Sequence, residues 1–157
     1  MIILEDTRQQ AGKHDRKHDD FTKKGIELSR CALAVGDYCL MPAVAVDTKK
    51  DIQELATDVY QDHERFRREC QKAQNGGTRL YILVENLSGI HSLEELHRWD
   101  NVKETRGRSK ISPKSLQKTL LTMSRKYGVI FLFCHPYESA RIIKDILTFK
   151  DKRNTNV

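Results

Sequence analysis

The 157-residue sequence has no apolar run that approaches membrane-spanning length, and it does not open with a secretory signal pattern. We therefore expect a cytoplasmic protein that is neither secreted nor inserted in a membrane. Its four cysteines, Cys31, Cys39, Cys70 and Cys134, form no Cys-x-x-Cys pair. Such scattered cysteines are typical of reduced, mostly buried thiols, and they argue against a structural zinc site.

Internal repeats are also absent, and the length suits one domain with a substantial core. We assign residues 1–149 to this domain and residues 150–157 to a flexible C-terminal tail. Lysine and arginine number 28 against 22 aspartate and glutamate residues, which gives a net charge of +6. A positive excess of this kind favours a polyanionic partner.

Short apolar runs alternate with amphipathic segments along the chain. The strands predicted from these runs are 2–4, 26–32, a segment ending at Gly36-Asp37, 44–49, 80–84 and 129–133. The predicted helices are 51–74, 92–99, 112–127 and 137–147. The polar segment up to 19 and the basic segment 101–110 are predicted to be loops, with one helical turn at 20–24. Strands interleaved with helices indicate an α/β sandwich around a central mixed sheet.

Two acidic residues and a lysine lie on adjacent predicted strands. Gly36-Asp37 ends one apolar run, and the next strand ends in Asp47-Thr48-Lys49. Because side chains alternate along a strand, Asp47 and Lys49 point to the same face, about 6.6 Å apart. A hairpin between the two strands would bring Asp37 to the same edge. Two carboxylates and an ammonium group in one cleft suit metal-assisted cleavage of a phosphodiester.

The acid-x-lysine spacing is weak evidence by itself, because the composition alone predicts about two such triplets and two occur. The second is Asp15-Arg16-Lys17, in a segment from Gly12 to Asp20 that has no apolar residue. We interpret that segment as a solvated loop and set it aside. The alternative interpretation of Asp47-Thr48-Lys49 is a non-functional strand end at the surface with solvated charges.

The ordered series of motifs is more specific, and it resembles the XPF-type (ERCC4-like) endonucleases of the PD-(D/E)xK superfamily. Gly36-Asp37 followed by Asp47-Thr48-Lys49 is similar to the GD…(E/D)xK signature of that family. Leu4-Glu5-Asp6-Thr7-Arg8 resembles its opening strand, and Leu80 to Glu85 its later strand with a terminal glutamate. Residues 112–147 resemble its closing helix-strand-helix. The resemblance implies a restriction-endonuclease-like three-layer fold, with a central mixed β-sheet flanked by helices, over residues 1–149.

The resemblance also implies a metal-dependent DNA endonuclease that hydrolyses phosphodiester bonds, with a preference for branched or flap-like DNA. Asp37, Asp47 and the carbonyl of Thr48 would ligate Mg²⁺ or Mn²⁺. Lys49 would orient or deprotonate the attacking water. Asp6 and Glu85 are further candidates for the metal, and no organic cofactor is expected. A homodimer and a cytoplasmic or nucleoid-associated location are consistent with this family.

The basic residues are the candidates for DNA contact. Arg8 and Lys50 lie beside the acidic motifs, and the others fall in two clusters, Arg67 and Arg68 in the helix 51–74, and Lys103, Arg106, Arg108 and Lys110 in the loop 101–110. Contacts of this kind hold the phosphate backbone and carry no sequence information. A solvated charged face is the alternative interpretation of each cluster.

The sequence departs from the family pattern at three positions. Asp47 replaces a glutamate, Thr48 replaces an arginine, and Gln53 occupies the place of a later aspartate. These departures leave open a catalytically weak or inactive DNA-binding module on the same fold. A restriction-type nuclease that cuts duplex DNA by sequence is a further alternative.

Overall fold

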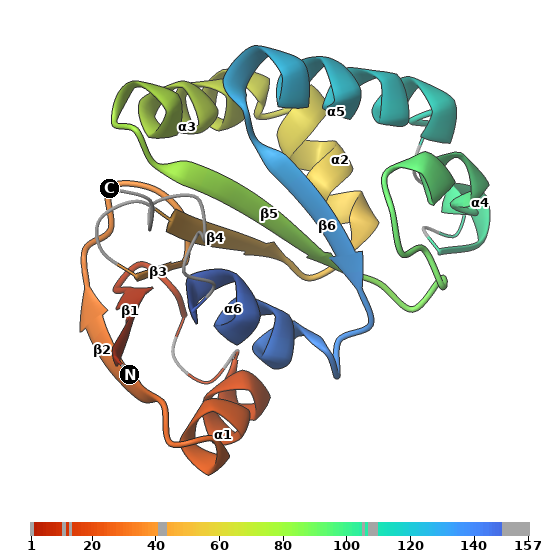
Figure 1. Cartoon of the computed structure of the whole chain (residues 1–157). Helices are drawn as coiled ribbons and strands as arrows, with labels where there is room; N and C mark the ends of the chain where they lie inside the picture. The colour runs from red at the N-terminus through yellow and green to blue at the C-terminus, as the bar shows by residue number, and fades with distance from the viewer. Residues whose placement is uncertain are drawn as a thin grey trace, which may run out of the picture.

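The computed structural model of this chain describes residues 2–10, 12, 14–40, 44–104, 106 and 110–148. Its centre is a six-stranded sheet with the strand order β2-β1-β3-β4-β5-β6 (Figure 1). The strands are β1 (Ile2–Asp6), β2 (Glu27–Cys31), β3 (Tyr38–Leu40), β4 (Val44–Lys49), β5 (Arg79–Glu85) and β6 (Ile130–Cys134). β1 pairs in parallel with β2, and β4, β5 and β6 pair in parallel with one another. β3 runs antiparallel to both of its neighbours, β1 and β4.

Helices cover both faces of this sheet, so the molecule has three layers. α2 (Ile52–Tyr60), α3 (His63–Asn75) and α5 (Pro113–Tyr127) lie on one face, and α1 (Asp15–Lys23) and α6 (Ser139–Thr148) lie on the other (Figure 1). Each face has its own apolar core. Phe66, Leu116 and Leu120 belong to the first core, and Phe21 and Ile143 belong to the second. The predicted α/β class and the central mixed sheet flanked by helices are confirmed.

Strand β4 contributes to both cores because it alternates strictly. Ala45 is fully buried in the first core and Val46 in the second. With both faces covered, the next residues, Asp47 and Lys49, are buried as well. The charged end of this strand is therefore enclosed by neighbouring elements rather than solvated at a free edge.

Local signals explain where the two best-defined helices begin and end. Asp51 caps α2 by accepting a hydrogen bond from the backbone N–H of Glu54 at 2.7 Å. Ser112 caps α5 ahead of Pro113, and Gly128 ends that helix with a left-handed backbone at φ 69°. The predicted helix 112–127 is thus present with its predicted start.

Four predicted elements differ in the structure. The strand predicted to end at Gly36-Asp37 is instead β3, which begins after this pair, and the run before Gly36 is not a strand. The segment 51–74 is two helices, because the chain turns at Gln61-Asp62 between α2 and α3. The predicted helix 92–99 is a short 3₁₀ helix, η1 (Glu94–Arg98), and part of the predicted basic loop is the short helix α4 (Asn101–Glu104). No described helix is long and apolar enough to cross a membrane.

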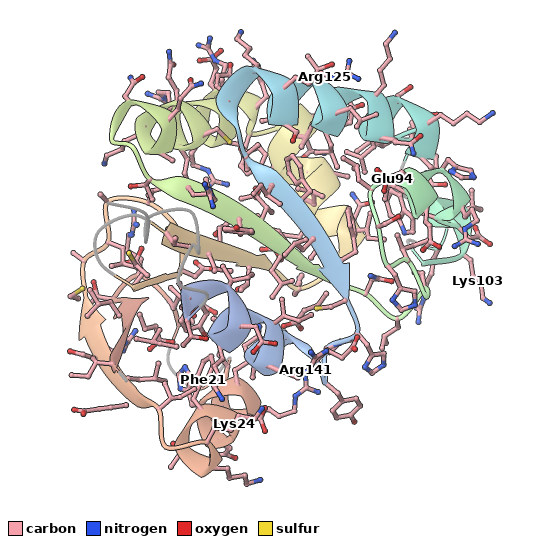
Figure 2. The ribbon with its side chains drawn as sticks, in the orientation of Figure 1. Phe21, Lys24, Glu94, Lys103, Arg125 and Arg141 are labelled. Carbon is pink, nitrogen blue, oxygen red and sulfur yellow. The ribbon has the colours of Figure 1, made fainter. Side chains whose placement is uncertain are left out.

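The largest correction concerns the polar segment before residue 20, which we predicted to be a solvated loop. Asp15–Lys23 is a helix, α1, that packs against α6. Phe21 anchors it, and Figure 2 shows this side chain between the two helices. Lys17 is also buried and forms an ion pair with Glu85 at the end of β5. A single aromatic side chain and a long-range ion pair thus hold a helix that lacks an apolar stripe.

Candidate active site

The predicted acidic residues come together because the main chains that carry them are hydrogen-bonded to one another. The N–H of Asp6 donates to the carbonyl of Asp37 at 2.8 Å, and the N–H of Asp37 donates to the carbonyl of Val46 at 2.7 Å. Gly36 makes this approach possible. Its φ is 75°, and a Cβ at this position would lie 3.1 Å from the Cβ of Ala45.

The carboxylate of Asp37 is held against the strand that carries Asp47. Asp37 Oδ2 accepts hydrogen bonds from the backbone N–H of Thr48 at 2.5 Å and from its hydroxyl at 2.8 Å. The threonine that stands in place of the family's arginine therefore orients an acidic side chain instead of extending toward solvent. Both contacts use Asp37 Oδ2, so Asp37 Oδ1 takes no part in them.

Lys49 lies between two carboxylates. Its Nζ is 2.7 Å from Asp47 Oδ2 and 2.6 Å from Asp58 Oδ2, and all three residues are 6% exposed. Burial by itself would lower the pKa of the Lys49 ammonium, but the two carboxylates outweigh burial and raise the pKa above its usual value. Lys49 is thus held as a cation, which favours orienting and charge-neutralising roles over proton abstraction.

The surroundings of Asp47 disfavour its charged form, whereas those of Lys49 favour the ammonium. Burial raises the pKa of this carboxyl, the nearby charges of Asp37 and Glu69 add to the shift, and Lys49 opposes it. Among the described residues, Asp47 Oδ2 has the ion pair with Lys49 and no further hydrogen-bond partner. The site therefore holds more carboxyl groups than it can easily keep ionised without a further cation.

Sequence reasoning missed Asp58 and Glu69, and it included Arg65 in a basic cluster of the helix without placing it at this site. Asp58 Oδ1 accepts a hydrogen bond from Arg65 at 2.8 Å, and Glu69 accepts one from the backbone N–H of Gly36 at 3.0 Å. A signal did exist for Asp58. Asp51, Glu54 and Asp58 fall at helical spacing, so α2 carries an acidic stripe on the face toward the end of β4. Nothing local in the sequence indicates that the helix turns that stripe inward.

These side chains line one pocket of about 390 Å³ at the carboxyl end of β4. The lining residues are Asp6, Arg8, Gln9, Gln10, His14, Gly36, Asp37, Asp47, Thr48, Lys49, Lys50, Glu54, Asp58, Arg65 and Glu69. Six of them are acidic and four are lysine or arginine, so the lining carries a formal excess of two negative charges. That excess equals the charge of one divalent cation.

The donor set fits a hard divalent ion. Asp37 and Asp47 bring carboxylate groups to the pocket, and Thr48 lines it as well. Within the described part of the chain, no three His, Cys, Asp or Glu side chains form a ready-made metal cage. Mg²⁺ does not need one, because it usually takes one or two carboxylates and keeps several waters. The under-satisfied oxygen of Asp47 and the negative excess both agree with this arrangement.

The remaining acidic candidates are placed differently from Asp37 and Asp47. Asp6 lines the same pocket, but its carboxylate is bound by Arg8, whose Nε donates to Asp6 Oδ2 at 2.6 Å. Burial opposes the effect, yet these hydrogen bonds keep the pKa of Asp6 below its usual value. Glu85 lines an adjoining pocket and is paired with Lys17. Their roles as metal ligands stay predictions.

The basic candidates divide into those near the pocket and those away from it. Arg8 and Lys50 line the pocket. On α3 it is Arg65 that reaches the pocket, whereas Arg67 faces a groove against α5 and Arg68 donates to the carbonyl of Glu64 at 3.2 Å. The predicted loop residues Lys103, Arg106 and Lys110 are exposed, and Figure 2 shows Lys103 pointing outward at the edge of the molecule. Arg108 lies outside the described residues.

The profile of the ERCC4 domain matches residues 6–146 of this sequence. The chain belongs to the ERCC4 domain family. This match contains the whole pocket, from Asp6 to Glu69, and it confirms the resemblance inferred from the ordered motifs. None of the curated proteins matches the sequence significantly.

Solved structures of XPF from Aeropyrum pernix share the fold of this ERCC4 domain. One is 15% identical with a TM-score of 0.67, and the match covers 94% of this chain and 60% of that one. The second, a complex with DNA, has the same identity and TM-score, and the match covers 99% of this chain and 68% of that one. This chain thus spans about three fifths to two thirds of the XPF chains.

Proposed function

We propose that this ERCC4 domain is a divalent-metal-dependent DNA endonuclease that hydrolyses phosphodiester bonds in branched or flap-like DNA. The observation that carries the proposal is the convergence of Asp37, Asp47 and Lys49 in one pocket whose lining has two surplus negative charges. Among the described residues, the buried Asp47 Oδ2 has an ion pair with Lys49 and no further hydrogen bond, which supports a cation-binding role for this carboxylate.

Each residue has a defined task in this proposal. Asp37 and Asp47, with the carbonyl of Thr48, would hold Mg²⁺ or Mn²⁺. When bound, the ion lowers the pKa of water and neutralises charge that builds on the phosphate. Lys49, kept charged by Asp58, orients the attacking water and contacts the scissile phosphate. Arg8 and Lys50, on the pocket wall, contact neighbouring phosphates.

Two further observations support DNA as the partner. The chain carries a net charge of +6 although its central pocket is negative, so the surplus cations lie elsewhere on the molecule. A structure of XPF with the same fold is a complex with DNA. The preference for branched DNA rests on the family alone.

The decisive test is cleavage of labelled flap, fork, junction and duplex DNA in Mg²⁺, Mn²⁺ or chelator. We expect the wild-type protein to cut branched substrates only with metal, and Asp47→Asn to lose that activity while its thermal unfolding stays cooperative. Asp145→Asn is the matched control, because this exposed carboxylate on α6 lies outside the pocket and pairs with Arg141. Cleavage that persists in chelator, or in Asp47→Asn, would refute the assigned mechanism.

A catalytically weak or inactive DNA-binding module is the second candidate. Gln53, which occupies the place of the family's later aspartate, favours this inactive module. Its side-chain amide donates to Thr57 on the same helix at 3.3 Å, and it does not line the pocket. Metal-independent binding without cleavage of any substrate would support this function. Preferential cutting of plain duplex at one sequence would instead support a restriction-type nuclease.

Self-association and a cytoplasmic or nucleoid-associated location complete the proposal. Both follow from the family and from the positive charge, and neither is needed for the chemistry above. Sedimentation velocity across a range of protein concentrations, with and without DNA, would measure self-association. A single species at the monomer mass at every concentration would refute the proposed homodimer.

A further inference from the structure

A stack of three planar side chains lies on the surface where β6 ends. The rings of His135 and Tyr137 are 5.1 Å apart with an interplanar angle of 17°. The guanidinium of Arg16, from α1, lies 4.4 Å from the centroid of the Tyr137 ring and also donates to the carbonyl of Pro136. Tyr137 is 76% exposed, so this ring contributes little to the core and is open to a flat ligand.

The strand register places this stack near the candidate active site. Lys49 on β4 lies opposite Val84 on β5, and the next residue of β5, Glu85, lies opposite Cys134 on β6. Because neighbouring strands are about 4.8 Å apart, the ends of β4 and β6 are separated by about 10 Å. The stack begins one residue beyond Cys134, so it lies on the same edge of the sheet as the pocket, two strands away.

A second pocket, of about 210 Å³, connects the two regions. Its lining shares His14, Thr48 and Lys50 with the central pocket and adds Arg16, Lys17 and Glu85. Glu85 and Lys17 neutralise each other as a buried ion pair, so Arg16 and Lys50 leave this pocket positive. Arg16 belongs both to this pocket and to the stack. A charged path therefore runs from Thr48 to Tyr137.

We propose that the surface group Arg16, His135 and Tyr137 is a stacking platform for an unpaired nucleotide of the DNA strand that leaves the active site. The proposal rests on the nuclease function above and assigns the residues that would hold the unpaired segment of its branched or flap-like substrate. Exposed aromatic rings bind bases of single strands irrespective of sequence, and arginine planes assist them. A base in a duplex has no free face, so fully paired DNA cannot use the platform.

The test uses a flap substrate that carries 2-aminopurine, a fluorescent base quenched by stacking, at one to four unpaired nucleotides from the junction. Binding is measured with Ca²⁺ in place of Mg²⁺ for the wild type, Tyr137→Ala and Tyr137→Phe. Tyr60→Ala is the matched control, because Tyr60 is another exposed tyrosine that lines a groove against α5. A fully paired duplex of equal length serves as the second substrate.

We expect the wild type to quench the probe and Tyr137→Ala to bind the flap about tenfold more weakly, since stacking of one base contributes about this much. Tyr137→Phe and Tyr60→Ala should bind as the wild type does, and all four proteins should bind the duplex equally. Absence of quenching, equal flap binding by Tyr137→Ala, or an equal loss on duplex would overturn the platform. A wild type that quenches the probe but cuts nothing in any metal would refute the nuclease and leave the platform standing.

Discussion

Asp58→Asn tests whether the lysine of the candidate active site depends on a residue outside the sequence motif. The substitution keeps the size of the side chain and removes its charge. Lys49 would then keep Asp47 at 2.7 Å and lose its partner at 2.6 Å. Arg65 also contacts Asp58, but Arg65 is largely exposed and has Asp62 within 3.5 Å as an alternative partner.

The magnitude follows from the burial of this contact. Lys49 and Asp58 are each 6% exposed, so water cannot replace the lost carboxylate. A hydrogen bond between charged groups contributes about 1.5–3 kcal/mol. We therefore expect the free energy of unfolding to fall by about that amount, and single-turnover cleavage to fall about 10- to 150-fold if Lys49 must be held in place.

The assay combines urea unfolding with single-turnover cleavage of a flap substrate in Mg²⁺. Asp62→Asn is the control, because it removes the exposed partner of Arg65 and leaves Lys49 untouched. Asp58→Glu should recover part of the lost cleavage by restoring the charge. The reasoning is refuted if Asp58→Asn cleaves within twofold of the wild type, or if Asp62→Asn is equally impaired.

Three further predictions use other parts of the structure. Gly36→Ala should destabilise the protein by about 1–2 kcal/mol in urea unfolding, because an L-residue is strained at φ 75°, and it should also impair metal-dependent cleavage. Burial raises the pKa of both Cys70 and Cys134 to about 12. At pH 8, iodoacetamide should therefore label these two thiols only after denaturation. Rapid labelling of Cys70 or Cys134 in the native protein would contradict this prediction. Replacing Lys103 and Lys110 by glutamine should reduce the salt slope of duplex binding by about 1.8, and an unchanged slope would remove this segment from the DNA interface.

The sheet and the motif were predictable because short-range patterns specify them. Val44 to Lys49 alternates with period two, and the structure places its two faces in two different cores. A hairpin does bring Asp37 to the strand of Asp47, but the strand that pairs with β4 is β3, which follows Asp37 instead of ending at it. Proximity is what the structure establishes, and the catalytic roles of these residues stay predictions.

The partners of these residues were not predictable, because they come from helices whose orientation is a long-range property. Asp58 looks like any acid on a solvated helix face, yet α2 buries it against Lys49. Helix α1 is a second case in which a long-range partner could not be predicted from the sequence. Lys17 lies in a segment without apolar residues, and only its pairing with Glu85, 68 positions later in the sequence, gives it a buried place. Composition and periodicity contain no information about such a pair.

The two main-chain hydrogen bonds that join Asp6, Asp37 and the strand of Asp47 have a consequence for how the pocket responds to change. The spacing of these residues is set by amide and carbonyl groups, which no side-chain substitution removes. Their amides should exchange with solvent deuterium as slowly as the centre of the sheet, in the presence or absence of metal. An ion entering the pocket would then spend little free energy on rearranging its ligands. This rigidity would also let the acidic side chains be exchanged for others, so that the pocket could be retuned for a different ion while the backbone stays in place.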